Sequence, residues 1–241
     1  MILDIDIGNS YAKWRLTDGA EICQSGSQAT TSISDGLDLP SGVPISRVRL
    51  SSVASDSLQS DLVAQMKSQF NAEVTVAKVS SSTAGVICGY DDPSSLGIDR
   101  WLAMVASYSR YQASVLVVDA GSAMTLDLVS TEGRHIGGYI LPGLTLMRDA
   151  LWGGTDRVKV DADAASCGID PAQGTVAAVN QGSLLASIAT IEKLRIQYQS
   201  NLVVTGGDAK KLLPYLKGKV DYQPNLVLDG LALGVVSTTK V

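Results

Sequence analysis

The stretch VLVVDAGSAMTLDLV, residues Val115–Val129, decides the fold because it joins two apolar runs through a tight glycine turn. The run before Asp119 is aliphatic and rich in valine, which is typical of a buried strand. Turn-forming residues follow it, with Gly121 and Ser122 at the centre, and the apolar rhythm then resumes. The stretch therefore predicts two strands connected by an Asp-x-Gly turn.

The N-terminus carries a second copy of this pattern. Asp6 and Gly8 follow an apolar run just as Asp119 and Gly121 do, and the two copies lie almost half the chain apart. Similarity at such a spacing indicates an internal duplication. We therefore expect an α/β fold with two duplicated domains, 1–114 and 115–241, whose mixed sheets are flanked by helices and hold a ligand between them.

Each of these turns suits the phosphate groups of a nucleotide. Glycine lets the backbone approach a ligand closely, and backbone N–H groups can bind phosphate oxygens, with Lys13 in reach of the first turn. The preceding aspartate can hold a cation that neutralises the phosphates. An ordinary hairpin explains a single copy, but it explains two copies at this spacing less well. Thr205-Gly206-Gly207 is a third glycine turn after a strand, for which a helix cap is an equal alternative.

The composition limits the function classes. Of 241 residues, 45% are hydrophobic and 18% charged, which is typical of a compact globular protein. The net charge of −5 argues against a nucleic-acid surface, and no long uncharged apolar run suits a membrane span. Cys23, Cys88 and Cys167 lack metal-like spacing, so we expect reduced core thiols in a cytoplasmic protein. The single His135 is expected to pack or hydrogen-bond, which leaves acid–base chemistry to carboxylates.

Hydrophobic periodicity predicts the remaining elements. Helices are expected at 57–70, 97–111, 144–151, 174–199 and 209–213, and strands at 20–25, 47–53, 72–79, 135–141 and 201–205. Segment 27–42 is expected as a loop or weak helix, 80–96 as a loop, 152–155 as a glycine-rich bend, and the region after Gly230 as a last helix that runs through Val236.

Gly97-Ile98-Asp99-Arg100 places an acid and a base at a loop-to-helix junction. The helix dipole favours an aspartate at a helix start, so Asp99 could have a purely structural role. Alternatively, Asp99 accepts the proton of a substrate hydroxyl as a general base, while Arg100 pairs with a substrate carboxylate or phosphate. The spacing alone supports both interpretations equally.

In this order, the motifs resemble the type III pantothenate kinases, a family that includes the Bvg accessory factor-like proteins and lies within the acetate and sugar kinase/Hsp70/actin superfamily. The resemblance covers nearly the whole chain. The motifs that carry it are DIGNS (6–10), Tyr90 with Pro93, GIDR (97–100), VVDAGSAMT (117–125), GGYILPG (137–143), GT (174–175), TGG (205–207) and LDGLALG (228–234).

The resemblance implies two ribonuclease-H-like (actin-like ATPase) domains with ATP in the cleft between them. It implies transfer of the γ-phosphoryl group to the 4′-hydroxyl of pantothenate, the first step of coenzyme A biosynthesis. The expected cofactors are Mg²⁺ with ATP and a monovalent cation, K⁺ or NH₄⁺, and the expected assembly is a homodimer.

The resemblance also assigns residues. Asp99 would be the proton acceptor, Asp119 the ligand of the monovalent cation, and Asp6 the ligand of magnesium through ATP. The ATP-binding residues would be Asp6, Ile7, Gly8, Asn9, Ser10, Tyr11, Ala12, Lys13 and Ser122. The pantothenate-binding residues would be Tyr90, Gly97, Ile98, Asp99, Arg100 and, across the dimer interface, Thr175.

Ser10 and Ser122 depart from the family pattern, which usually has threonine at both positions. Serine keeps the hydroxyl but lacks the methyl group that restricts the rotamer, so we expect an effect on nucleotide affinity. Two other functions remain open. A sugar or acetate kinase would fit the phosphate turns but not the short chain or the GIDR motif. A catalytically idle regulator that binds nucleotide would be expected to lack one of the three aspartates, and all three are present.

Overall fold

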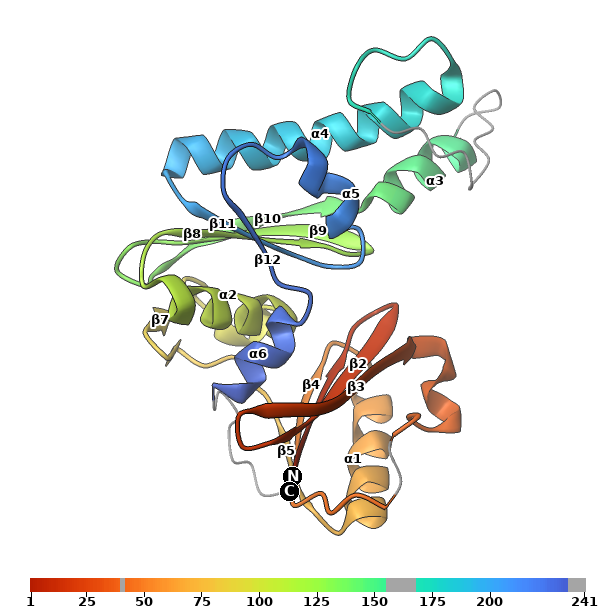
Figure 1. Ribbon diagram of the computed structural model, residues 1–241, viewed down its shortest axis with the longest axis vertical. Coiled ribbons are helices and arrows are strands. Elements are labelled where there is room, and N and C mark those ends of the chain that lie inside the picture. Colours follow the sequence, from red (N-terminus) through yellow and green to blue (C-terminus); the bar gives the residue numbers. More distant parts are fainter. Residues whose placement is uncertain (40–41, 155–167, 234–241) are drawn as a thin grey trace. The chain divides into compact units, whose positions relative to one another are not determined.

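The residues of the computed structural model form two compact units (Figure 1). The first contains Met1–Arg110 together with the segment that begins at Asn225, and the second contains Tyr111–Pro224. The structure describes residues 1–39, 42–154 and 168–233.

Each unit contains a mixed sheet, and the two sheets have the same strand order. The first sheet, in spatial order, is β3 (Glu21–Ala29), β2 (Tyr11–Asp18), β1 (Ile2–Ile7), β4 (Arg47–Ser52) and β5 (Glu73–Val76). The second is β10 (His135–Pro142), β9 (Ala123–Val129), β8 (Val115–Ala120), β11 (Asn201–Thr205) and β12 (Val220–Tyr222). In both, three antiparallel strands are followed by two parallel ones. This repetition confirms the predicted duplicated ribonuclease-H-like fold.

Most predicted helices are confirmed to within a few residues. They are α1 (Asp56–Phe70), α2 (Ile98–Tyr111), α3 (Leu144–Gly154), α4 (Thr175–Tyr198) and α5 (Ala209–Leu212). The expected loops contain short elements, namely the 3₁₀ turns η1 (Thr30–Asp35) and η2 (Pro93–Ser95) and a small hairpin of β6 (Ser82–Thr83) and β7 (Val86–Ile87). Pro214 lies in a third 3₁₀ turn, η3 (Leu213–Tyr215), directly after α5. Among the described residues, no helix is long and apolar enough to cross a membrane.

Some expectations were wrong in detail. The predicted bend at 152–155 is instead the end of α3, which continues to Gly154 because glycine lowers helix propensity without forbidding a helix. Cys23 is exposed rather than a core thiol, since it lies on β3 at the edge of its sheet. β3 also continues to Ala29, beyond its predicted end. Cys167 and residues 234–236 lie outside the described part of the chain.

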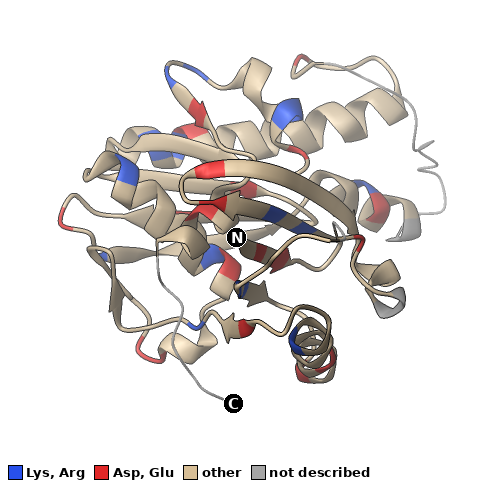
Figure 2. Ribbon diagram, turned by 60° about the horizontal axis from the view of Figure 1, so that its bottom comes forward, with Lys and Arg blue, Asp and Glu red and all other residues tan. Residues whose placement is uncertain are grey.

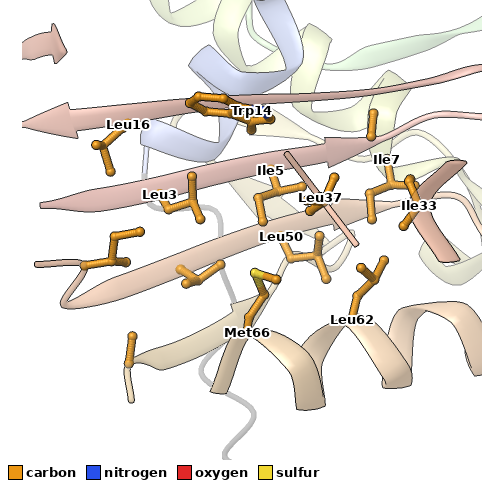
Figure 3. Packing of buried hydrophobic residues seen from close by; sticks show 14 residues of the cluster. Leu3, Ile5, Ile7, Trp14, Leu16, Ile33, Leu37, Leu50, Leu62 and Met66 are labelled. Carbon is orange, nitrogen blue, oxygen red and sulfur yellow. The ribbon is translucent and has the colours of Figure 1, made fainter. Parts of the chain in front are cut away.

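The first sheet buries one face against α1. Leu3, Ile5 and Ile7 alternate along β1 and are almost fully buried, as expected for a strand face turned to the core. Figure 3 shows Leu62 and Met66 of α1 pointing toward this face. The alternation also directs the intervening acidic side chains of β1 to the opposite face of the sheet.

That opposite face carries a buried ion network centred on Asp4. The Asp4 carboxylate, 0% exposed, accepts hydrogen bonds from Arg15 Nε at 3.1 Å and from Arg49 Nε and Nη2 at 2.6 and 2.9 Å. Arg15 also donates to Asp229 Oδ1 at 2.6 Å and to the carbonyl oxygen of Leu228 at 2.5 Å. A buried carboxylate is tolerated only with such partners, and here they join β1, β2 and β4 to the last described helix, α6 (Leu226–Ala232).

Helix α6 therefore belongs to the first unit, although the sequence suggested a second half that runs from 115 to 241. It contacts β1 and β4, and it also approaches α2 closely. A Cβ atom at Gly230 would lie 2.4 Å from the carbonyl oxygen of Leu102, so only glycine permits this approach. Asp229 and Gly230 lie within α6 rather than before a helix, contrary to expectation.

The second sheet packs against α4. Leu116 and Val118 of β8 join Leu126 of β9 in a core with Leu184 and Ile191 of α4. Acidic and basic positions are interspersed along the ribbon of both units (Figure 2). An anionic ligand must therefore be bound by local groups rather than by a broad field of one sign.

The Asp4 network generates a stability prediction. Asp4→Asn removes the carboxylate that Arg49 faces and leaves Arg15 with Asp229 alone, so the free energy of unfolding should fall by about 3 kcal/mol. Urea unfolding of the full chain measures this change. Glu73→Gln is the matched control because it breaks the exposed Arg47–Glu73 pair, and its cost should stay below about 1 kcal/mol. Equal losses in the two variants would contradict the role given to Asp4.

Candidate functional site

The first Asp-x-Gly turn connects β1 to β2 and is supported by Thr30, the first residue of η1. Gly8 donates its N–H to the Tyr11 carbonyl oxygen at 3.0 Å and closes the turn. The Thr30 hydroxyl donates to the Gly8 carbonyl oxygen at 2.8 Å, and the Thr30 N–H donates to the Ser10 carbonyl oxygen at 3.0 Å. These bonds fix the turn backbone while the side chains of Asn9 and Ser10 stay exposed.

Asp6 lies in the middle of a row of polar residues across three strands. In the strand register it is opposite Lys13 of β2 on one side and opposite Ser51 of β4 on the other. Residues opposite one another project from the same face of a sheet, so these three side chains share the face that carries the Asp4 network. The row places a carboxylate between an ammonium group and a hydroxyl at the edge of the first turn.

Two of the predicted ATP-binding residues are turned away from this face. Ile7 and Ala12 are both 0% exposed and belong to the apolar core of the first unit. Their side chains are therefore structural, and any contact with a nucleotide would come from their backbone. Tyr11, in contrast, is 61% exposed.

The second turn, between β8 and β9, is enclosed by two other glycine motifs. Gly143 donates its N–H to the Ser122 carbonyl oxygen at 3.0 Å, and a Cβ atom at Gly143 would lie 2.3 Å from the Gly121 carbonyl oxygen. Asp208, after the TGG motif, donates its N–H to the Ala120 carbonyl oxygen at 2.9 Å. The DAGS, LPG and TGG motifs thus converge on one place in the second unit.

Gly206 approaches Asp119 most closely. It has a φ of +95°, and a Cβ atom there would lie 2.4 Å from the Ala120 carbonyl oxygen and 2.5 Å from Asp119 Oδ1. In the register, Asp119 is opposite Thr125 of β9 and Thr205 of β11. The second turn thus repeats the first, with an aspartate at the end of a central strand and a hydroxyl residue on the adjacent parallel strand.

The expected substrate residues of the first unit lie together at the start of α2. Arg100 donates from Nη1 to the Tyr90 hydroxyl at 3.1 Å, and its guanidinium carbon lies 5.9 Å from the centre of the Tyr90 ring. Asp99 Oδ1 accepts the N–H of Arg100 at 2.8 Å. A Cβ atom at Gly97 would lie 2.6 Å from Asp99 Oδ1. Glycine at 97 therefore makes room for the carboxylate at the helix start.

The loop that leads to α2 has its own acidic cap. Asp92 accepts hydrogen bonds from the hydroxyl and N–H of Ser94 and begins the turn η2. The side-chain bond and then the backbone bond from Ser94 lower the pKa of Asp92 below its ordinary value. Asp92 is exposed, so we assign it to the loop structure rather than to chemistry.

Thr175 and His135 lie in the second unit. Thr175 is the exposed first residue of α4, after Gly174. His135 is 1% exposed at the start of β10, and its Nε2 atom lies 3.1 Å from Asp127 Oδ1. This buried pair bears out the expected hydrogen-bonding role of His135.

The donor set fits cations that are held jointly with a nucleotide. Within the described residues, no three His, Cys, Asp or Glu side chains gather where they could hold a metal ion. Mg²⁺ is usually bound through one or two carboxylates together with substrate phosphates and water. The single carboxylates Asp6 and Asp119, each beside a glycine turn, match that kind of site.

Sequence reasoning missed three residues of the site. Thr30 supports the first turn from a segment that was expected to be a loop or weak helix, and the sequence gives no signal for this contact. Ser51 and Thr205 were placed on strands but not beside Asp6 and Asp119. The parallel register reveals both positions, and the shared strand order could have been used to align them.

The repeated strand order and the paired Asp-x-Gly turns define a protein of the duplicated ribonuclease-H-like class. The family model for type III pantothenate kinase matches residues 2–197 of this chain. The chain therefore belongs to the type III pantothenate kinase family.

Curated relatives agree with this assignment. A type III pantothenate kinase of Chromohalobacter salexigens is 39% identical over 96% of this chain and 86% of its own length. One from Pseudomonas aeruginosa is 38% identical over 97% of this chain and 98% of its own length. A solved structure from Campylobacter jejuni, described as a conserved putative Baf family transcriptional activator, has a TM-score of 0.61 at 23% identity and covers 95% of both chains. At this identity, the match to the Campylobacter jejuni structure supports only the fold.

Gly206→Ala tests the packing of the second turn. The added Cβ atom would meet Asp119 and the Ala120 carbonyl oxygen in a backbone conformation that alanine rarely adopts. The free energy of unfolding should therefore fall by at least about 2 kcal/mol. Gly207→Ala is the matched control, because a Cβ atom there has no neighbour within 4 Å. Similar urea midpoints for the two variants would refute the proposed constraint.

Proposed function

We propose that this chain transfers the γ-phosphoryl group of ATP to the 4′-hydroxyl of pantothenate and forms 4′-phosphopantothenate, the first step of coenzyme A biosynthesis. The observation that carries the proposal is the relationship over nearly the whole chain to proteins named type III pantothenate kinase. The retained Asp6, Asp99 and Asp119 support it, because an idle relative would not need all three. A cytoplasmic location is part of the proposal, since ATP is available there.

Asp99 is the proposed general base. Phosphoryl transfer depends mainly on positioning and charge neutralisation, so one base within reach of the hydroxyl suffices. The hydrogen bond from the Arg100 N–H holds the Asp99 carboxylate at the start of α2. Arg100 is buried and donates to the Tyr90 hydroxyl. Its guanidinium group suits the pantothenate carboxylate, since guanidinium groups form strong bonds to carboxylates. Gly97 and Ile98 complete this side of the proposed site.

The two turns are the proposed phosphate-binding elements. Lys13 beside Asp6 supplies positive charge to the phosphates, and the backbone and hydroxyls of Ser10 and Ser122 supply donors. When bound, Mg²⁺ neutralises charge on the transferred group.

Asp119 is the proposed ligand of a monovalent cation, K⁺ or NH₄⁺. Its carboxylate has Thr205 and Thr125 opposite it in the strand register, and Gly206 confines it. Oxygen atoms of carboxylate, hydroxyl and carbonyl groups are suitable ligands for hard cations. A cation there would offset the charge that two or more phosphate groups bring to the turn.

A homodimer is also part of the proposal. Several large apolar side chains are exposed on β10, α3 and α4. Helix α3 contacts both β10 and α4. Exposed apolar groups on adjoining elements are typical of interaction surfaces. They are Tyr139, Ile140, Leu146, Leu151, Trp152 and Leu185. Thr175 begins α4, so a partner subunit that covers this helix could meet substrate there.

Asp99→Asn tests the reaction and the base together. It retains an oxygen for the Arg100 N–H but cannot accept a proton, so kcat should fall roughly a hundredfold or more. ADP release with ATP, Mg²⁺ and pantothenate, in K⁺ or in Na⁺ alone, measures this. Asp56→Asn, at the first turn of α1, controls for loss of a helix-start charge. Folded protein that binds ATP but never turns over pantothenate in any salt would favour the regulator instead.

Ile140→Asp tests the homodimer. A buried charge would disfavour association, so analytical ultracentrifugation should show a shift from dimer to monomer and pantothenate affinity should fall with it. Ile22→Asp, at a comparably exposed position of the first unit, should leave the dimer intact. If the wild-type protein is a monomer at micromolar concentration, the proposed homodimer is wrong.

A further inference from the structure

The hydroxyl of Ser51 is buried beside Asp6 without a hydrogen-bond partner. Ser51 is 0% exposed, and among the described residues nothing bonds to its Oγ atom. Buried polar groups in proteins nearly always have a partner, so a group without one calls for an explanation such as a bound ligand, ion or water. Nothing in the role of β4 as a strand requires serine at this position.

The Ser51 hydroxyl lies on the same face of the sheet as Asp6, next to the first turn. Val48 and Leu50 of β4 belong to the apolar core on the α1 side of the sheet. Side chains alternate along a strand, so Ser51 projects from the other face. It is opposite Asp6 in the parallel register between β1 and β4. The unpartnered hydroxyl and the carboxylate therefore lie side by side where β1 enters the turn.

The second unit repeats this pairing. β8 and β11 occupy the places of β1 and β4 in the common strand order. Asp119 at the end of β8 is opposite Thr205 at the end of β11, and Thr205 is 3% exposed. A buried hydroxyl residue thus stands beside the turn aspartate in both units. The pairing at Ser51 is therefore a feature of the duplicated turn and not a local accident of β4.

The charges around Asp6 decide what this hydroxyl could hold. Lys13 is opposite Asp6 on the β2 side, so a cation at Asp6 would be repelled from that side and favoured on the β4 side. Arg49 lies two residues before Ser51, but its guanidinium is bonded to Asp4. Asp4 binds Arg15 and Arg49, and Asp229 binds Arg15 and Arg110. Each of these arginines therefore faces a carboxylate, which weakens its repulsion of a cation at Asp6.

We propose that Ser51 is a positioning residue for the divalent cation that accompanies ATP, and that its hydroxyl binds a water of the hydrated ion held at Asp6. Mg²⁺ gives up its water reluctantly and keeps several water molecules when it binds to proteins. Groups that orient such waters without touching the metal affect metal affinity strongly. This inference rests on the proposed function only in that the chain binds ATP with Mg²⁺.

Ser51→Ala tests the inference by metal binding rather than by turnover. Calorimetry on the full chain would measure Mg²⁺ affinity in the presence of a non-hydrolysable ATP analogue, and affinity for the analogue alone in excess EDTA. The Mg²⁺ dissociation constant should rise about tenfold, while binding of the metal-free analogue stays within twofold. The melting temperature of the ligand-free protein should not fall, because no protein hydrogen bond is lost.

Thr75→Val is the matched control. Thr75 of β5 is opposite Arg49 in the register and is 6% exposed. The substitution therefore removes a buried hydroxyl from the same face of the sheet, but away from Asp6. It should leave Mg²⁺ affinity unchanged. Equal Mg²⁺ affinities for Ser51→Ala and Thr75→Val would overturn the inference, as would a ligand-free melting temperature lowered by Ser51→Ala.

The outcomes separate this inference from the proposed function, because pantothenate is absent from the binding assay. Wild-type protein that binds the analogue and Mg²⁺, with no effect of Ser51→Ala, refutes the role of Ser51 alone. Wild-type protein that binds no nucleotide refutes the proposed function and this inference together.

Discussion

The carboxylate of Asp4 organises the first unit, because it holds two arginine side chains inside the protein. Its bonds to Arg15 and Arg49 cross three adjacent strands, and Arg15 extends them to α6. Charged groups at such depth are stable only when each has a partner in good geometry. The position of the first turn depends on this arrangement, since Asp6 follows on the same strand face two residues later.

The backbone of the Asp-x-Gly turn is held in place by different contacts in the two units. Thr30 fixes the first turn through hydrogen bonds from the start of η1. Gly143 and Gly206 fix the second by permitting close backbone contact, which any side chain would prevent. A duplicated strand order thus carries two unlike supports. This difference agrees with unlike proposed roles, one turn for phosphate with a divalent cation and the other for phosphate with a monovalent cation.

Sequence reasoning predicted the fold well because the strongest signals were local. Apolar runs into Asp119 and Asp6 fix strand, turn and strand within a few residues, and the repeat then gives the duplication. Partners that lie far apart in the chain were not predictable in this way. The contact of Arg15 with Asp229 and the support from Thr30 depend on tertiary packing. Ser51 was invisible for the same reason, since only the strand register places it beside Asp6.

The placement of α6 has a consequence for how the protein is made. The ribosome releases residues 1–110 of the first unit early, but Asp229, the partner of Arg15, emerges only after the whole second unit has been synthesised. The second unit is one continuous segment and can complete its sheet before α6 is available. We therefore expect the nascent chain to complete its units out of order, because the first unit lacks α6 until the second unit has been made, contrary to the usual N-terminal-first sequence of domain folding.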